Sequence, residues 1–230
     1  MVFIVFYEVI ILDYLFYKSV TGWYTFNCMN TITKNTLLPV GSPGDIPGAL
    51  RGTPFGRLLE YQNCGTPFGL HNTAELLVCM CMDNRKQLRL PDNFAYILRT
   101  GGGNIRNSEF KVAYAIGVGG VRHIALIAHD NCGMVNLAPR RGAFIAGLVK
   151  NAGWRPRQAM EYFDAKAQLH EIGNELEFVR SEARRLSALY PKAKVLPMFY
   201  RISDGRLYLI KAARARVSTL GPGIRVGAGK

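Results

Sequence analysis

Acidic residues are scarce in this chain of 230 residues, which has 16 Asp and Glu against 29 Lys and Arg. The resulting formal charge of +13 attracts anions at long range but does not specify a fold. Charged residues make up 20% of the chain and glycine has no three-residue period, which excludes coiled-coil and collagen-like proteins. Hydrophobic residues, at 49%, are too many for a disordered chain. We therefore expect one globular domain with a substantial core.

Cysteine is also sparse, and its five positions are odd in number and irregular in spacing. A secreted disulfide framework has an even number of cysteines, so we expect a reducing compartment and a cytoplasmic location. In such a compartment a cysteine is a metal ligand, a nucleophile or a small buried side chain. We interpret Cys28, Cys64 and Cys79 as core residues, and Cys81 and Cys132 as candidates for chemistry.

The long apolar stretch at the N-terminus lacks the features of a targeting segment. Glu8 and Asp13 interrupt residues 1–17, and an acid at a bilayer centre costs about 2.5–3.5 kcal/mol. No basic residues precede the stretch and no small-residue cleavage point follows it. We expect neither a membrane span nor a secretory signal, and interpret residues 1–36 as an atypical segment. One hypothesis is that the natural protein starts at Met29.

Two further segments differ from the rest in composition. Residues 37–75 are rich in proline and glycine and contain one pentapeptide twice, as Gly52-Thr-Pro-Phe-Gly56 and Gly65-Thr-Pro-Phe-Gly69. Five residues repeated once are too few for a solenoid, so we expect an extended arm with a short helical piece at 57–61. Residues 211–230 contain basic residues and no acid, which predicts a solvated tail; a nucleic-acid arm is the alternative.

Residues 76–210 have the pattern of an α/β domain. The run Leu76–Met82 is apolar throughout and stops at polar residues, as expected of a parallel strand buried on both faces. A helix at 109–118 should follow Ser108, a good N-cap, with Phe110 and Tyr114 on one stripe. We expect further strands at 94–98, 124–128, 194–200 and 206–210, and further helices from Pro156 and at 171–189. The predicted fold class is α/β, with a single mostly parallel β-sheet flanked by helices and an extended N-terminal arm.

Two of the predicted strands end in potential zinc ligands. Cys81 closes the first strand, and His129 and Cys132 follow another. Open α/β sheets place ligands at the carboxyl ends of parallel strands, and zinc prefers thiolate and imidazole donors. Three protein ligands leave one position open, which is the pattern of a catalytic zinc site. A structural zinc site, closed by Asp83 as a fourth ligand, is the alternative.

These residues resemble the β-class carbonic anhydrases. That family has Cys-x-Asp-x-Arg, a segment like Arg-Asn-Ala-Gly, a helix, and a strand that ends in His-x-x-Cys-Gly. The chain has the same order in Cys81-Met-Asp-Asn-Arg85, Arg99-Thr-Gly-Gly102, the helix after Ser108, and His129-Asp-Asn-Cys-Gly-Met134. The resemblance is strong over residues 76–149 and looser toward the last two strands.

The resemblance implies a zinc enzyme that reversibly hydrates carbon dioxide to bicarbonate, with one Zn²⁺ per chain. The metal ligands would be Cys81, His129 and Cys132, and the zinc would lower the pKa of a bound water toward about 7. Asp83 would orient the resulting hydroxide and Arg85 would hold Asp83. If that pair breaks, Asp83 can become a fourth ligand. The glycines expected at the substrate are Gly101, Gly102 and Gly103.

Several positions depart from the family's usual form. Asp130 and Asn131 stand where the family often has Thr and Asp, and Met82 replaces a Ser. Asn72 lies in the region of a substrate-contacting Gln. Some relatives hydrolyse carbonyl sulfide or carbon disulfide, so a hydrolase of these compounds is one alternative function. A non-catalytic, zinc-stabilised binding protein that uses its basic surface is another.

Other motifs favour less specific interpretations. Residues 101–103 and 117–120 are glycine-rich, but neither follows a strand as Gly-x-Gly-x-x-Gly, which argues against a nucleotide site. The remaining histidines are interpreted as structural or solvent-facing, with a proton-shuttle role open for each: His71, His123 and His170.

The predicted arm also bears on assembly. It has few means of burying Phe55, Leu58 and Phe68 within itself, so we expect it to wrap a neighbouring subunit. The resemblance implies a homodimer or higher homo-oligomer with sites near the shared interface. Carbon dioxide and bicarbonate are the expected small-molecule partners, and neither nucleic acid nor a membrane is expected.

Overall fold

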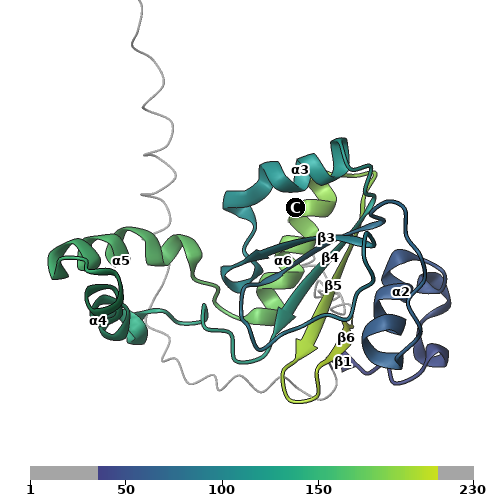
Figure 1. The fold of residues 1–230 in the computed structure, drawn as a ribbon, viewed down its shortest axis with the longest axis horizontal. Coiled ribbons are helices and arrows are strands. Elements are labelled where there is room, and N and C mark those ends of the chain that lie inside the picture. The colour runs from purple at the N-terminus through teal and green to yellow at the C-terminus, as the bar shows by residue number, and fades with distance from the viewer. Residues whose placement is uncertain (1–35, 212–230) are drawn as a thin grey trace, which may run out of the picture. The chain divides into compact units, whose positions relative to one another are not determined.

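Figure 1 shows a computed structural model that describes residues 36–211. Several predictions lie outside these residues: the N-terminal segment with its start at Met29, the core role of Cys28, and the basic tail after Lys211. Within residues 36–211, no helix has the length and apolar character that crossing a bilayer requires.

A six-stranded sheet forms the centre of the fold, in the order β1-β6-β5-β4-β2-β3. Its strands are β1 (Leu37–Leu38), β2 (Leu76–Cys81), β3 (Ala95–Thr100), β4 (His123–His129), β5 (Lys194–Arg201) and β6 (Arg206–Ile210). Strands β3, β2, β4 and β5 are parallel, whereas β6 and β1 are antiparallel to their neighbours. The predicted single, mostly parallel sheet is confirmed.

The apolar run of β2 is buried because helices cover both faces of the sheet. Side chains of a strand alternate between faces. Val78 and Met80 pack into the large core on the α2 side, whereas Cys79 lies with Phe178 and Val179 on the α6 side. Cys81, two residues on, shares the face of Cys79.

The described chain contains five α-helices, of which α4 and α5 pack against each other (Figure 1). They are α2 (Pro54–Leu59), α3 (Glu109–Gly117), α4 (Arg141–Ala152), α5 (Pro156–His170) and α6 (Glu175–Leu189). Pro156 opens α5 as predicted. The helix predicted from residue 171 begins only at Glu175, because the Asn174 side chain accepts hydrogen bonds from the N–H groups of Leu176 and Glu177. Helix α6 packs across β4 and β5.

The segment before β2 is more compact than the predicted arm. It contains two 3-10 turns, α2, and a π-helical turn over Glu60–Cys64. The expectation that Phe55 and Leu58 have no place in their own chain is wrong, because they are 3% and 0% exposed in the core. Phe68 of the second pentapeptide is 48% exposed. The first pentapeptide instead starts a helix, since Thr53 caps the N–H of Gly56.

The stripe predicted on α3 faces outward. Val112 and Ala115 are the buried residues of this helix, whereas Phe110 is 81% exposed. Ser108 precedes the helix, but its side chain makes no capping hydrogen bond. Together with Tyr96 of the edge strand β3, Phe110 and Tyr114 line a groove of about 340 Å³.

Candidate metal centre

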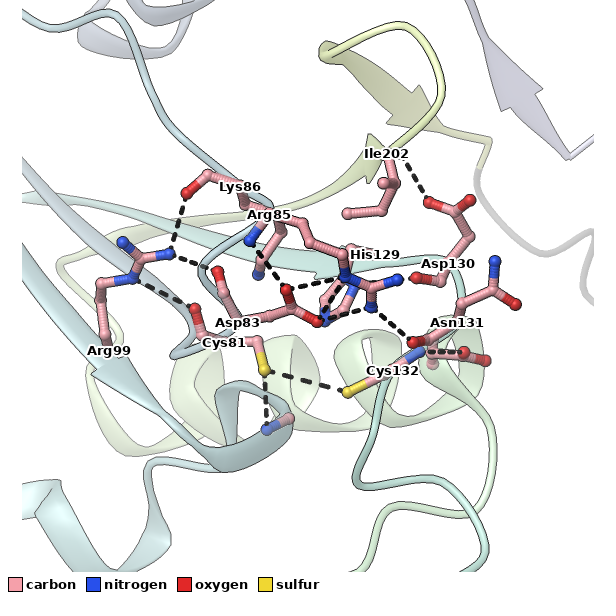
Figure 2. Close-up of polar contacts among 12 residues, drawn as sticks. Cys81, Asp83, Arg85, Lys86, Arg99, His129, Asp130, Asn131, Cys132 and Ile202 are labelled. Carbon is pink, nitrogen blue, oxygen red and sulfur yellow. Dashed lines mark hydrogen bonds and ion pairs between the residues drawn. The ribbon is translucent and has the colours of Figure 1, made fainter.

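Two neighbouring strands bring three predicted ligands together. Cys81 ends β2, His129 ends β4, and Cys132 follows in the loop after β4. All three residues are buried, and their ligand atoms lie within 4.8 Å of one another. Figure 2 shows the two thiols facing each other, with 3.9 Å between their sulfur atoms. The carboxyl ends of the adjacent parallel strands β2 and β4 therefore bring the three side chains into one small cluster.

The His129 ring presents an unused nitrogen. Its Nδ1 lies 2.8 Å from the backbone oxygen of Asp130, and since a carbonyl only accepts, Nδ1 carries the proton and Nε2 the lone pair. Among the described residues, Nε2 is buried and has no hydrogen-bond partner. A buried acceptor without a partner is costly unless something else binds it. This orientation of the ring is the one that metal-binding histidines have.

The donor set fits zinc. Two sulfurs held about 2.3 Å from one tetrahedral ion lie about 3.8 Å apart, close to the 3.9 Å between Cys81 Sγ and Cys132 Sγ. That distance is too long for a disulfide, and both cysteines are free. Two thiolates and one imidazole, with the lone pair of His129 directed inward, are the donors expected of a zinc site.

The cysteines of β2 differ in reactivity. The thiols of Cys81 and Cys132 share a hydrogen bond, which lowers the pKa of Cys81 and raises the pKa of Cys132. The N–H of Gly102 also points at Cys81 Sγ, at 3.3 Å. Burial raises the pKa of Cys79 to about 12. Cys79 is therefore an inert core thiol in the structure, whereas Cys81 is disposed to ionise.

A carboxylate lies beside the cluster but outside it. Arg85 holds Asp83 through three side-chain contacts, Nε to Oδ1 at 3.0 Å, Nε to Oδ2 at 3.2 Å and Nη2 to Oδ2 at 2.6 Å. These hydrogen bonds keep the pKa of Asp83 well below that of a free carboxyl group. The same guanidinium donates to the backbone oxygen of Asn131 at 2.9 Å (Figure 2). Arg85 thus joins the loop after β2 to the loop after β4 and holds Asp83 outside the three-ligand group.

Arg99 has a structural role that the sequence did not reveal. Its guanidinium donates to the backbone oxygens of Cys81, Asp83 and Lys86, at 3.2, 2.8 and 3.0 Å. These bonds fix the loop that carries Asp83 against β3. A cation near the end of a strand, where carbonyls of the next loop need donors, is the signal that could have indicated this role.

Lys86 is a second residue that sequence reasoning missed. Its side chain is 0% exposed, and among the described residues its Nζ has no hydrogen-bond partner. Burial lowers the pKa of Lys86 to about 8, against an opposing effect of Cys81, Cys132 and Asp83. A lysine after Cys-x-Asp-x-Arg reads from sequence as solvent-facing, so no pattern in the chain predicts this burial.

The three predicted glycines form a 3-10 turn next to Cys81. Gly102 has φ +63° and Gly103 has φ +72°, which favour glycine. A Cβ at Gly102 would also lie 3.0 Å from the Ile172 side chain. The turn therefore needs glycine to approach the cluster, and contact with substrate stays a prediction.

The other histidines lie outside the three-ligand cluster. His71 bridges the Tyr61 hydroxyl, at 3.1 Å, and Glu75, at 2.8 Å, which makes it a structural residue. His123 packs edge-on against Phe55, and burial lowers its pKa. His170 is exposed, as is Asn72 in the loop before β2.

An apolar cavity of about 510 Å³ adjoins the site. Met82, Gly101 and Met134 form its wall on the cluster side, and most of the other lining residues come from α4 and α5. Met134 packs against the buried group of Cys81 and Cys132. Met134 therefore belongs both to the cavity wall and to the apolar surroundings of the two thiols.

Comparison with known proteins gives structural matches only. No family model matches the chain, and no curated protein matches it. The similar solved structures are mostly β-carbonic anhydrases, the family that the motifs resemble. A β-carbonic anhydrase from Trichomonas vaginalis is 15% identical, with a TM-score of 0.49 over 64% of this chain and 89% of that one.

Two further structures have similar values. The carbonic anhydrase from Glaciozyma antarctica is 19% identical, with a TM-score of 0.48 over 70% of this chain and 98% of that one. A carbon disulfide hydrolase in its apo form is 18% identical, with a TM-score of 0.44 over 69% of this chain and 89% of that one. At identities this low, a similar structure says nothing of the activity of this chain. Any proposal about activity must therefore rest on the geometry of the site itself.

Proposed function

We propose that the chain is a zinc enzyme that reversibly hydrates carbon dioxide to bicarbonate, with one Zn²⁺ held by Cys81, His129 and Cys132. One observation carries the proposal: three buried donors converge, and Arg85 keeps the neighbouring carboxylate of Asp83 out of the cluster. A structural zinc site would be closed by four protein ligands. Three donors and a restrained carboxylate are what a catalytic site needs.

The residues around the cluster support the chemistry. When bound, zinc would lower the pKa of a coordinated water to about 7 and so supply a nucleophile at neutral pH. Asp83, ionised because of Arg85, accepts hydrogen bonds and no longer donates them. It can therefore fix the orientation of a donor next to the cluster, and Arg85 fixes Asp83. Gly101, Gly102 and Gly103 would let a small substrate approach the same point.

The apolar cavity also suits a second candidate substrate class. Carbonyl sulfide and carbon disulfide are linear like carbon dioxide but larger and more polarizable, and the cavity wall next to the cluster contains the thioethers of Met82 and Met134. Met82 is 64% exposed where the resembled family has a polar serine. The same zinc site would then hydrolyse these sulfur compounds.

The experiment is to load purified protein with zinc and to measure turnover of carbon dioxide, carbonyl sulfide and carbon disulfide in parallel. Carbon dioxide hydration faster than turnover of either sulfur compound supports the proposal. Turnover of the sulfur compounds alone selects the second candidate. Bound zinc with no turnover of any of the three would select a non-catalytic, zinc-stabilised protein.

We also propose that a second copy covers the edge of the sheet at β3. Ile97 and Phe110 are 52% and 81% exposed there, around the groove between β3 and α3. An open edge strand with apolar neighbours is an aggregation hazard unless it is covered. We expect a homodimer that buries this surface. The predicted arm does not supply the interface through Phe55 and Leu58, because both are buried within their own chain.

Light scattering at micromolar concentration tests the assembly. Phe110→Glu should convert a wild-type dimer to a monomer, because a charge would be buried at the interface. Leu70→Glu is the matched control, since Leu70 is fully exposed outside this surface. A wild-type monomer, or dimers in all three proteins, would contradict this interface.

A further inference from the structure

The fold encloses the side chain of Lys86 without giving its ammonium group a hydrogen bond from the described residues. The side chain is among the largest that are fully buried, and its Nζ has no hydrogen-bond partner among the described residues. Burying an ammonium group without a partner is far more costly than burying a neutral side chain. A methionine is of similar length and would fill the same space without that cost.

The charges near Lys86 belong to the candidate metal centre. Cys81 from β2, Cys132 from the loop after β4, and Asp83 favour its charged form. Arg99 from β3 opposes it. Lys86 and Asp83 lie close together in the same loop, since the N–H of Lys86 donates to the backbone oxygen of Asp83 at 3.4 Å (Figure 2). The negative groups that offset the buried ammonium are therefore the metal ligands and the carboxylate beside them.

The backbone holds Lys86 in this position. Arg99 donates to its carbonyl oxygen at 3.0 Å, and Arg85 on its N-terminal side joins the loop to Asn131. Both contacts fix the point from which the lysine side chain enters the interior. The loop that carries Asp83 therefore also carries a lysine whose side chain is enclosed and not released to solvent.

We propose that Lys86 is a positioning residue that supplies a buried positive charge, and that this charge favours a small monovalent anion, such as bicarbonate, at the open position of the metal centre. The inference rests on the proposed function. Two thiolates cancel the formal charge of a divalent ion, so a nearby cation adds an attraction for an anion beyond the bond to the metal itself. A fixed cation in the low-dielectric interior then contributes directly to the affinity for that anion.

The test uses Co²⁺-loaded protein at pH 7, with thiocyanate as the anion and the visible absorption of cobalt as the readout. Lys86→Met should raise the dissociation constant of thiocyanate by roughly tenfold, because the attraction of one buried positive charge is lost. Lys192→Met removes an exposed lysine and should leave the constant unchanged. An unchanged constant in Lys86→Met would overturn the inference.

A second measurement separates this role from a structural one. The metal-free Lys86→Met protein should be at least as resistant to urea as the metal-free wild type, because an unpaired buried charge has been removed. Lys86→Leu should behave in the same way. Lower resistance in both variants would show that the lysine serves the fold, and would overturn the inference. A wild type that binds no metal would instead overturn the proposed function, and this inference with it.

Discussion

Cys79 and Cys81 make a matched pair for testing which thiol binds metal. Both lie on β2 on the same face of the sheet, and they are 1% and 4% exposed. Replacing either with alanine removes one buried sulfur, a loss comparable to one methylene group and thus about 1 kcal/mol of the free energy of unfolding. In the absence of metal the two variants should therefore unfold at similar temperatures, about 2–4 °C below wild type.

Zinc should separate the two variants. A ligand at a thousand times its dissociation constant stabilises the folded state by about 4 kcal/mol, which raises the melting temperature of a protein of this size by about 8–16 °C. Cys79→Ala should keep that increase and bind one zinc per chain. Cys81→Ala should lose it, because one of three ligands is missing.

The assay is thermal unfolding with added zinc and with a chelator, together with zinc content by mass spectrometry. We expect zinc to raise the melting temperature of wild type and of Cys79→Ala but not that of Cys81→Ala. If Cys81→Ala kept its zinc while Cys79→Ala lost it, the assignment of the ligand would be refuted. Equal zinc binding by both variants would refute it as well.

Three further predictions concern Arg85, Leu58 and Asp83. Arg85→Ala should keep its zinc but hydrate carbon dioxide about 10- to 100-fold more slowly, because Asp83 is then free to occupy the open position. Hydration at the wild-type rate would show that Arg85 is not needed to keep Asp83 off the metal. Leu58→Ala should lower the free energy of unfolding by about 2–5 kcal/mol in urea, since Leu58 is 0% exposed; a loss near zero would restore the arm as a separate segment. The depressed pKa of Asp83 contributes stability that is present above about pH 4 and is lost as the pH falls through the folded-state pKa. Metal-free Asp83→Asn should therefore lose less stability than wild type between about pH 5 and pH 2, and parallel losses would contradict this.

The sheet and the three donors could be predicted from sequence because each depends on a local pattern. The apolar run of β2 stops at the polar residues after Cys81, and β4 stops in the same way before Cys132. Strand ends of this kind show which side chains lie at the carboxyl end of a strand. In a parallel sheet these ends lie at the same edge. No knowledge of the loops was needed for that step.

The remaining features depend on contacts between distant parts of the chain. Phe55 and Leu58 are buried because α2 packs on the sheet, and nothing in residues 37–75 by themselves indicates that surface. Phe110 and Tyr114 share a stripe as predicted, but this stripe is exposed and the buried residues of the helix are Val112 and Ala115. Lys86 reads as a surface residue, since lysine is almost never buried alone. Periodicity identifies which residues share a face but not what covers that face.

Zinc at Cys81, His129 and Cys132 is proposed to make this chain hydrate carbon dioxide. The most direct test is to titrate metal-free protein with zinc and to measure the hydration rate by stopped flow after each addition. We expect the hydration rate of the wild type to rise in proportion to added zinc and to stop rising at one equivalent per chain. The rate of Cys132→Ala should stay at background throughout. Uptake of one equivalent of zinc with no hydration above background, or hydration that does not depend on zinc, would contradict it.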